Sequence, residues 1–186
     1  NAYTKVYDNV DIEAATKKNI IVTYTPGVNA NSVAEFTFGL ILNSTRNIID
    51  AYDAVRAKKP ERLKFKGMEL YGKTLGIIGV GNIGKRVYEL GLAFGMKILA
   101  YHPRPSAKRL KNLKLKLVNL DYLLRNSDVI TIHARLTDET RYMIKEKEFS
   151  KMKKSAILVN MARGEIVDEG ALYKALKERK IRKAAI

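Results

Sequence analysis

Cysteine is absent from this 186-residue sequence, and so is tryptophan. Without cysteine the chain has no disulfide framework, no thiolate nucleophile and no Cys-based zinc site. Only two histidines, His102 and His133, are present, so we expect no metal site built from histidine. No apolar run approaches the roughly 20 residues that span a bilayer, and no signal-peptide pattern opens the chain. We therefore expect a cytoplasmic protein with no membrane partner and no metal.

Acidic residues are also scarce, because 35 Lys and Arg face 19 Asp and Glu and give a net charge of +16. Such a balance raises the question of nucleic acid or another polyanion as partner. The lysines are scattered, however, and many alternate with apolar residues, as in residues 113–117, where a strand would turn every second side chain to water. No basic stripe interleaved with aromatics is present. We therefore do not expect nucleic-acid binding, and keep a polyanion-binding domain as an alternative.

The first 60 residues read as mainly helical. Residues 11–18 predict a short amphipathic helix, and the apolar run 19–23 predicts a strand. Ser32-Val33-Ala34-Glu35 fits a capping box and predicts a helix that runs to about Arg56. This helix is apolar on more than one side, so we expect it to be buried between layers or against another subunit.

From Thr74 onward, short apolar strands alternate with helical segments. This alternation predicts an α/β fold with a parallel sheet covered by helices on both faces. The expected strands are 75–79, 97–101, 115–118, 128–133, 156–160 and a last one from 184, and the expected helices are 83–94, 120–125, 146–152 and 169–179.

One glycine motif carries chemistry. Gly79-Val80-Gly81-Asn82-Ile83-Gly84 follows an apolar strand and opens a helix, which is the context in which G-x-G-x-x-G binds a dinucleotide. The first glycine allows a tight turn, the second lets a pyrophosphate approach the backbone, and the third lets helix and strand pack closely. The N-terminus of the helix then offers unpaired N–H groups to the phosphates.

Several separate motifs follow one another along the chain, at residues 7–11, 25–27, 32–35, 74–84, 95–97, His133, Leu136, Thr137, Thr140 and 160–169. In this order they resemble the D-isomer-specific 2-hydroxyacid dehydrogenases, above all the phosphoglycerate dehydrogenases and then the glyoxylate or hydroxypyruvate reductases. The resemblance implies an NAD(P)-dependent oxidoreductase that acts on a small 2-hydroxy or 2-oxo acid. A nucleotide-binding or sensing module without turnover is the alternative from another class.

The resemblance also implies how the chain is divided. Residues 1–30 would be a remnant of a flavodoxin-like substrate domain, and residues 31–70 a linking helix and connection. Residues 71–186 would form a Rossmann-type, doubly wound dinucleotide-binding domain whose last strand is truncated. The long apolar helix and the segment after it would contribute to a homodimer.

The resemblance assigns the catalytic arginine to Arg163. A planar guanidinium can hold the carboxylate of a 2-oxo acid through two hydrogen bonds and polarise the adjacent carbonyl. The cofactor-binding residues that the glycine motif and the resemblance imply are Gly79, Val80, Gly81, Asn82, Ile83, Gly84, His102, Pro103, Arg104, Ala134, Met161, Ala162 and Arg163.

The sequence departs from the family pattern in several places. The family's general acid–base histidine, its orienting glutamate and a carboxylate that closes the nicotinamide pocket would all follow Ile186, so we expect the 186 residues by themselves to be inactive. Arg135 stands where the family usually has proline, and Thr4 and Val6 stand where it has glycine.

A further departure concerns the choice of cofactor. His102 replaces the acidic residue that normally binds the adenosine ribose and repels a 2′-phosphate. Arg104 stands where NADP-using relatives carry an arginine, and Lys108 and Arg109 follow closely. We therefore expect NADP(H) to be favoured over NAD(H).

Overall fold

The computed structural model describes residues 10–59, 62–103 and 115–186. The expectations for Thr4, Val6, Arg104, Lys108 and Arg109 therefore lie outside the described residues. In the part of the chain that is described, no helix is long and apolar enough to cross a membrane.

A six-stranded sheet forms the centre of the molecule, and all five of its strand pairs are parallel. The order β3-β2-β1-β4-β5-β6 is that of a doubly wound Rossmann sheet, in which the direction of winding reverses between β1 and β4. The predicted fold class is thus confirmed. The strands are β1 (Thr74–Ile78), β2 (Lys97–Tyr101), β3 (Lys116–Leu117), β4 (Val129–Ile132), β5 (Ile157–Asn160) and β6 (Lys183–Ala185).

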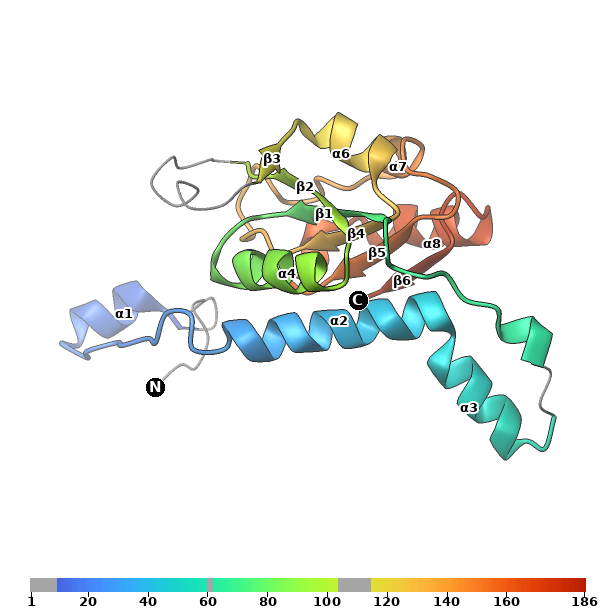
Figure 1. The fold of residues 1–186 in the computed structure, drawn as a ribbon. Coiled ribbons are helices and arrows are strands. Elements are labelled where there is room, and N and C mark those ends of the chain that lie inside the picture. The colour runs from blue at the N-terminus through green and yellow to red at the C-terminus, as the bar shows by residue number, and fades with distance from the viewer. Residues whose placement is uncertain (1–9, 60–61, 104–114) are drawn as a thin grey trace.

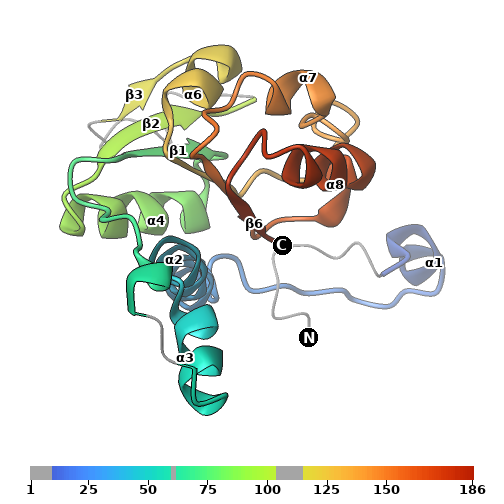
Figure 2. The same cartoon turned by 90° about the vertical axis from the view of Figure 1, so that its right-hand side faces the viewer.

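Helices cover both faces of this sheet (Figures 1 and 2). On one face lie α2 (Ala30–Arg46) and α4 (Asn82–Ala93), and on the other lie α6 (Leu120–Asn126), α7 (Glu146–Phe149) and α8 (Glu169–Lys177). Because side chains alternate along a strand, Val129 joins the apolar cluster under α2 and α4, whereas Ile130 joins the cluster under α6, α7 and α8. Burying each such side chain contributes about 1.5–3 kcal/mol to stability.

The helix expected over residues 32–56 is instead two helices, α2 and α3 (Ile48–Arg56). They are separated by Asn47, which has φ 55° and ψ 43°, a left-handed conformation that asparagine tolerates better than most residues. The Lys183 ammonium donates to the Asn47 side-chain oxygen over 2.9 Å and so ties the break to β6. The predicted capping box is wrong, because α2 begins after Asn29 and Ser32 lies inside it.

Near the N-terminus the sequence predicts a helix and then a strand, and of these two elements the structure contains the helix. Helix α1 (Ile12–Lys17) forms as expected, and the Asp11 carboxylate accepts a hydrogen bond from the Ala14 N–H over 2.9 Å. The strand expected at 19–23 is absent, and Ile21 there is 89% exposed. The segment is not part of the six-stranded sheet, and Tyr24, which follows it, forms a single β-bridge. Two short 3₁₀ helices, η1 (Arg62–Phe65) and η2 (Gly164–Ile166), complete the structure.

Candidate functional site

The glycine-rich turn between β1 and α4 is shaped by close backbone contacts. Gly79 has φ +97°, and a Cβ atom there would lie 2.5 Å from the Ala134 backbone nitrogen. A Cβ on Gly84 would collide with the Gly79 carbonyl oxygen, so this glycine lets α4 pack on the turn. A Cβ on Gly81 would meet no atom within 4 Å. Gly79 and Gly84 are therefore required by the fold, whereas Gly81 leaves space beside the turn.

The N-terminus of α4 is open to a ligand. Gly81 precedes the helix, no side chain caps it, and its first turn holds no acidic residue. The first N–H groups of a helix have no partner within the helix, and the helix dipole places partial positive charge there. The turn can therefore bind an anion such as a phosphate.

A pocket of about 460 Å³ lies against this turn. Its wall comes from the connection before α2 and the first turn of that helix, from the glycine turn, and from the segments that follow β2, β4 and β5. The carboxyl ends of these strands meet at one edge of the sheet, where open α/β sheets bind their ligands. The lining residues are Gly27, Asn29, Val33, Gly79, Gly81, Asn82, Ile83, His102, Pro103, His133, Ala134, Arg135, Leu136, Thr137, Glu139, Thr140, Met161, Ala162 and Arg163.

The pocket brings together ten of the candidate residues from the sequence. They are Gly79, Gly81, Asn82, Ile83, His102, Pro103, Ala134, Met161, Ala162 and Arg163. Val80 and Gly84 do not line it, because both are buried in the turn and its packing against α4. Arg104 lies outside the described residues.

The structure also adds residues to which sequence reasoning gave no role. Gly27 and Asn29 reach the pocket from the connection before α2, and Val33 reaches it from the first turn of that helix. A Cβ on Gly27 would lie 2.6 Å from the Asn82 side-chain nitrogen. After β4, Arg135, Leu136, Thr137, Glu139 and Thr140 line the pocket. Both segments contain motifs on which the resemblance to the family rests, so the resemblance could have pointed to these residues.

Arg163 is presented by a short loop that Asn160 holds. The Asn160 side chain is buried; its nitrogen donates to the Arg163 carbonyl oxygen over 2.9 Å, and its oxygen accepts from the Ala162 N–H over 3.1 Å. Two hydrogen bonds from one side chain fix the backbone of this loop at the end of β5. Arg163, itself half-buried, is thereby held on the pocket wall.

The loop after β4 is closed by the Thr140 hydroxyl. It donates to the Arg135 carbonyl oxygen over 2.6 Å and accepts from the Thr137 N–H over 2.8 Å. Thr140 is 3% exposed, so this crosslink is shielded from water. The two hydrogen bonds join the Arg135 and Thr137 ends of the loop to Thr140.

The charges on the wall favour an anionic ligand. Arg135 and Arg163 line the pocket together with one carboxylate, that of Glu139, among the described lining residues. Burial lowers the pKa of His133 to about 4, so this ring is neutral at physiological pH. His102 and Pro103 form the wall at the end of β2, where the described lining contains no acidic side chain.

Three features together define a dinucleotide-binding domain of the Rossmann class. They are a parallel sheet in this strand order, a glycine turn that leads to an uncapped helix, and a pocket across the reversal of the strand order. Residues 38–186 match the family model of the D-isomer specific 2-hydroxyacid dehydrogenase NAD binding domain. The chain belongs to this family.

Named relatives and solved structures agree with this family. The chain is 47% identical over 180 residues to D-3-phosphoglycerate dehydrogenase of Methanocaldococcus jannaschii and 50% identical over 188 residues to glyoxylate reductase of Aeropyrum pernix. These matches cover 96% and 97% of the chain but only 34% and 56% of the relatives. D-lactate dehydrogenase from Aquifex aeolicus, solved with NAD and lactic acid, is 39% identical with a TM-score of 0.84, covering 95% of this chain and 53% of that one.

Proposed function

We propose that the enzyme carrying this sequence moves a hydride between C2 of a small 2-hydroxy or 2-oxo acid and a nicotinamide cofactor. The observation that carries the proposal is the position of Arg163 in the same pocket as the open N-terminus of α4. Oxidation of 3-phosphoglycerate is the first candidate reaction, and reduction of glyoxylate or hydroxypyruvate is the second. Relatives with each of these names match the chain.

The protein's part in this reaction is binding and orientation. A bound nicotinamide ring supplies or accepts the hydride. In this proposal Gly81 and Asn82 of the turn hold the pyrophosphate, and Ala134, Met161 and Ala162 contact the nicotinamide side; all five line the pocket. Arg163 then fixes the substrate carboxylate through two hydrogen bonds, which orients C2 toward the ring.

Replacing Arg163 by lysine in the complete enzyme tests this role. Lysine keeps the charge but cannot form the planar fork, so kcat/KM for the 2-oxo acid should fall about 10- to 100-fold, the equivalent of the roughly 1.5–3 kcal/mol of a hydrogen bond to a charged group. The dissociation constant for NADH should stay within a few-fold. Arg135→Lys is the matched control because Arg135 lines the same pocket. A fall in kcat/KM confined to Arg135→Lys would assign the substrate carboxylate to Arg135. If the complete wild-type enzyme bound nucleotide without turnover, a sensing module would be favoured instead.

We also propose that NADPH binds more tightly than NADH. The support is His102, which lines the pocket at the end of β2 where a carboxylate would repel a 2′-phosphate. Arg104 follows in the sequence and can add a charge-assisted hydrogen bond, which corresponds to about a 10- to 100-fold preference. Titrating both nucleotides against the wild type, Arg104→Ala and His102→Asp tests the assignment. Equal affinities in the wild type would refute it.

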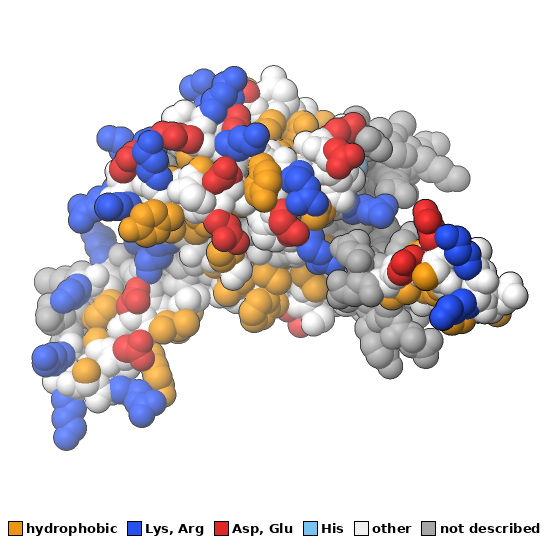
Figure 3. Space-filling model, turned by 180° about the vertical axis from the view of Figure 1, so that it is seen from behind, with side chains coloured by type: hydrophobic (Ala, Val, Ile, Leu, Met, Phe, Trp, Pro, Cys, Tyr) orange, Lys and Arg blue, Asp and Glu red, His pale blue; other side chains and the backbone are white. Residues whose placement is uncertain are grey.

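The expected homodimer is likewise a proposal. Phe36 on α2 and Ile48, Ile49, Tyr52 and Val55 on α3 are between 53% and 64% exposed, and Figure 3 shows hydrophobic side chains on the projecting α3 segment. A second copy that covers these side chains would bury an apolar face that is otherwise in water. The division of the chain at residues 30 and 70, the inactivity of the 186 residues alone and the cytoplasmic location stay predictions.

A further inference from the structure

His133 carries a buried polar atom that the fold does not satisfy. Among the described residues, two buried side-chain nitrogen atoms have no hydrogen-bond partner, Arg86 Nε and His133 Nδ1. Of the two residues only His133 lines the pocket. Buried polar groups in native proteins are almost always paired, so an unpaired one at a ligand site calls for a partner.

Thr131 determines which nitrogen of the ring carries the proton. Its hydroxyl lies 2.9 Å from His133 Nε2, and Thr131 is fully buried with no other side-chain hydrogen bond in the described part of the chain. If Nε2 carried the proton, the Thr131 hydroxyl hydrogen and the Nδ1 lone pair would both be unpaired. If Nδ1 carries it, the hydroxyl donates to Nε2 and one group, the Nδ1–H, is left without a partner. Thr131 therefore selects the tautomer with a free donor at Nδ1.

The position of His133 indicates which part of a dinucleotide would meet this donor. His133 directly follows β4, the first strand beyond the reversal of the strand order. Its backbone N–H donates to the carbonyl oxygen of Ile78 in β1 over 2.7 Å. A dinucleotide lies across this reversal with its pyrophosphate at the start of α4. The end of β2 would then face the adenosine half, and the segments after β4 and β5 would face the nicotinamide half.

We infer that His133 is a neutral hydrogen-bond donor to an oxygen of the nicotinamide nucleotide half of the bound cofactor, with Thr131 as the positioning residue that fixes its tautomer. The inference rests on the proposed cofactor binding and adds a contact that the glycine motif does not supply. The Nδ1 atom is screened from solvent, so the contact needs a small movement of the pocket wall, as side chains at binding sites commonly make.

The ring can be observed directly because the sequence has only two histidines. In the purified chain labelled with ¹⁵N-histidine, NMR should show the neutral Nδ1–H tautomer for His133, assigned by the loss of its signals in His133→Asn. NADH or NADPH should shift Nδ1 and slow the exchange of its proton, and AMP should do neither. A free ring in the Nε2–H tautomer, or a ring that responds equally to AMP and dinucleotide, would overturn the inference.

Affinity measurements separate this inference from the proposed function. His133→Phe and Thr131→Val should weaken NADH binding about two- to tenfold, the range of one neutral hydrogen bond, and leave AMP binding unchanged. His133→Asn should restore most of the affinity, because the asparagine amide nitrogen can replace Nδ1–H. Dinucleotide binding with no effect of these variants would refute the contact alone. Failure of the wild type to bind either dinucleotide would refute the proposed cofactor and the contact with it.

Discussion

The strands of the sheet and the helices that precede them in the sequence differ in how far their apolar residues are buried. Strands β4 and β5 are buried along their whole length, whereas α1 and α3 contain no buried residue. The apolar face of α3 is as clear in the sequence as the apolar strands are, yet Tyr52 and Val55 remain 58% and 64% exposed. A sequence pattern thus identifies an apolar face, and the neighbouring elements decide whether that face is buried.

The largest expected effect on stability comes from Gly79→Ala, in the turn that follows the carboxyl end of β1. Alanine at φ +97° is strained, and its Cβ would lie 2.5 Å from the Ala134 backbone nitrogen. Strain and overlap together should lower the free energy of unfolding by about 2–5 kcal/mol, measured by urea denaturation followed by circular dichroism. Nucleotide binding should be lost as well.

Gly81→Ala is the matched control for this substitution. Its φ is −95°, and its Cβ meets no atom within 4 Å, so stability should change by at most about 1 kcal/mol, the cost of alanine at a helix N-cap. The added methyl group would occupy space on the pocket wall, so nucleotide affinity should still fall. Equal destabilisation by both variants would contradict the distinction between the two glycines.

A smaller effect is expected from Asp128→Asn, where β4 begins beside β1. Burial opposes ionisation of this carboxyl, but the Lys153 ammonium at 2.8 Å and the Thr74 N–H at 2.8 Å outweigh it and lower the pKa of Asp128 below 3.8. Because the folded pKa is the lower one, the stabilisation is present above about pH 4 and is lost as the pH falls through the folded pKa. The variant should lose about 1–3 kcal/mol at pH 7, and the difference should shrink in acid.

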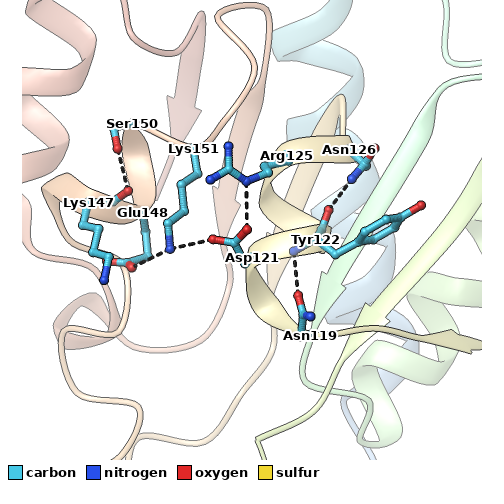
Figure 4. A network of polar contacts seen from close by, with 9 residues as sticks. All are labelled: Asn119, Asp121, Tyr122, Arg125, Asn126, Lys147, Glu148, Ser150 and Lys151. Atoms are coloured by element: carbon cyan, nitrogen blue, oxygen red, sulfur yellow. Dashed lines mark hydrogen bonds and ion pairs between the residues drawn. The ribbon is translucent and has the colours of Figure 1, made fainter.

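Asp121→Asn provides the exposed counterpart. Asp121 lies in the surface network of Figure 4, where hydrogen bonds from Lys151 and Arg125, both at 2.8 Å, lower the pKa of Asp121 to about 2. Exposed ion pairs are screened by water and salt. This variant should therefore change stability less than Asp128→Asn, and 1 M salt should abolish the change. A loss as large as that of Asp128→Asn would show that burial does not distinguish the two carboxylates.

The sequence could predict the sheet and the glycine turn because they depend on local patterns. Apolar runs, helical periodicity and glycine spacing all lie within a few residues of one another. At the break, the Asn47 side chain is hydrogen-bonded to Lys183 and Lys66, which are 136 and 19 residues away, and helical periodicity gives no sign of such contacts. The role proposed for His133 depends on which of its ring nitrogens contacts the Thr131 hydroxyl in the folded chain. Contacts between distant segments, such as Gly27 with Asn82, were beyond sequence reasoning for the same reason.

Gly39→Ala tests the flanking helices with a change in the opposite direction. Gly39 lies inside α2 and is exposed, and a Cβ atom at this position would meet no other atom within 4 Å. Alanine should raise the free energy of unfolding by about 0.5–1 kcal/mol, because glycine loses more backbone entropy on folding. A destabilised variant, measured by the same urea denaturation, would show that a second copy or another segment closely contacts this position.

The smallest effect on folding is expected from the double substitution Tyr52→Lys and Val55→Lys on α3. Both side chains are more than half exposed, so the free energy of unfolding of the monomer should change by less than about 0.5 kcal/mol per site. Two charges on the proposed contact face should nevertheless abolish the dimer in analytical ultracentrifugation. Ile21→Lys, at a residue that is 89% exposed outside α3, should leave the dimer intact. A monomeric wild type, or a dimer that survives both lysines, would show that the apolar face of α3 is not covered by a second copy.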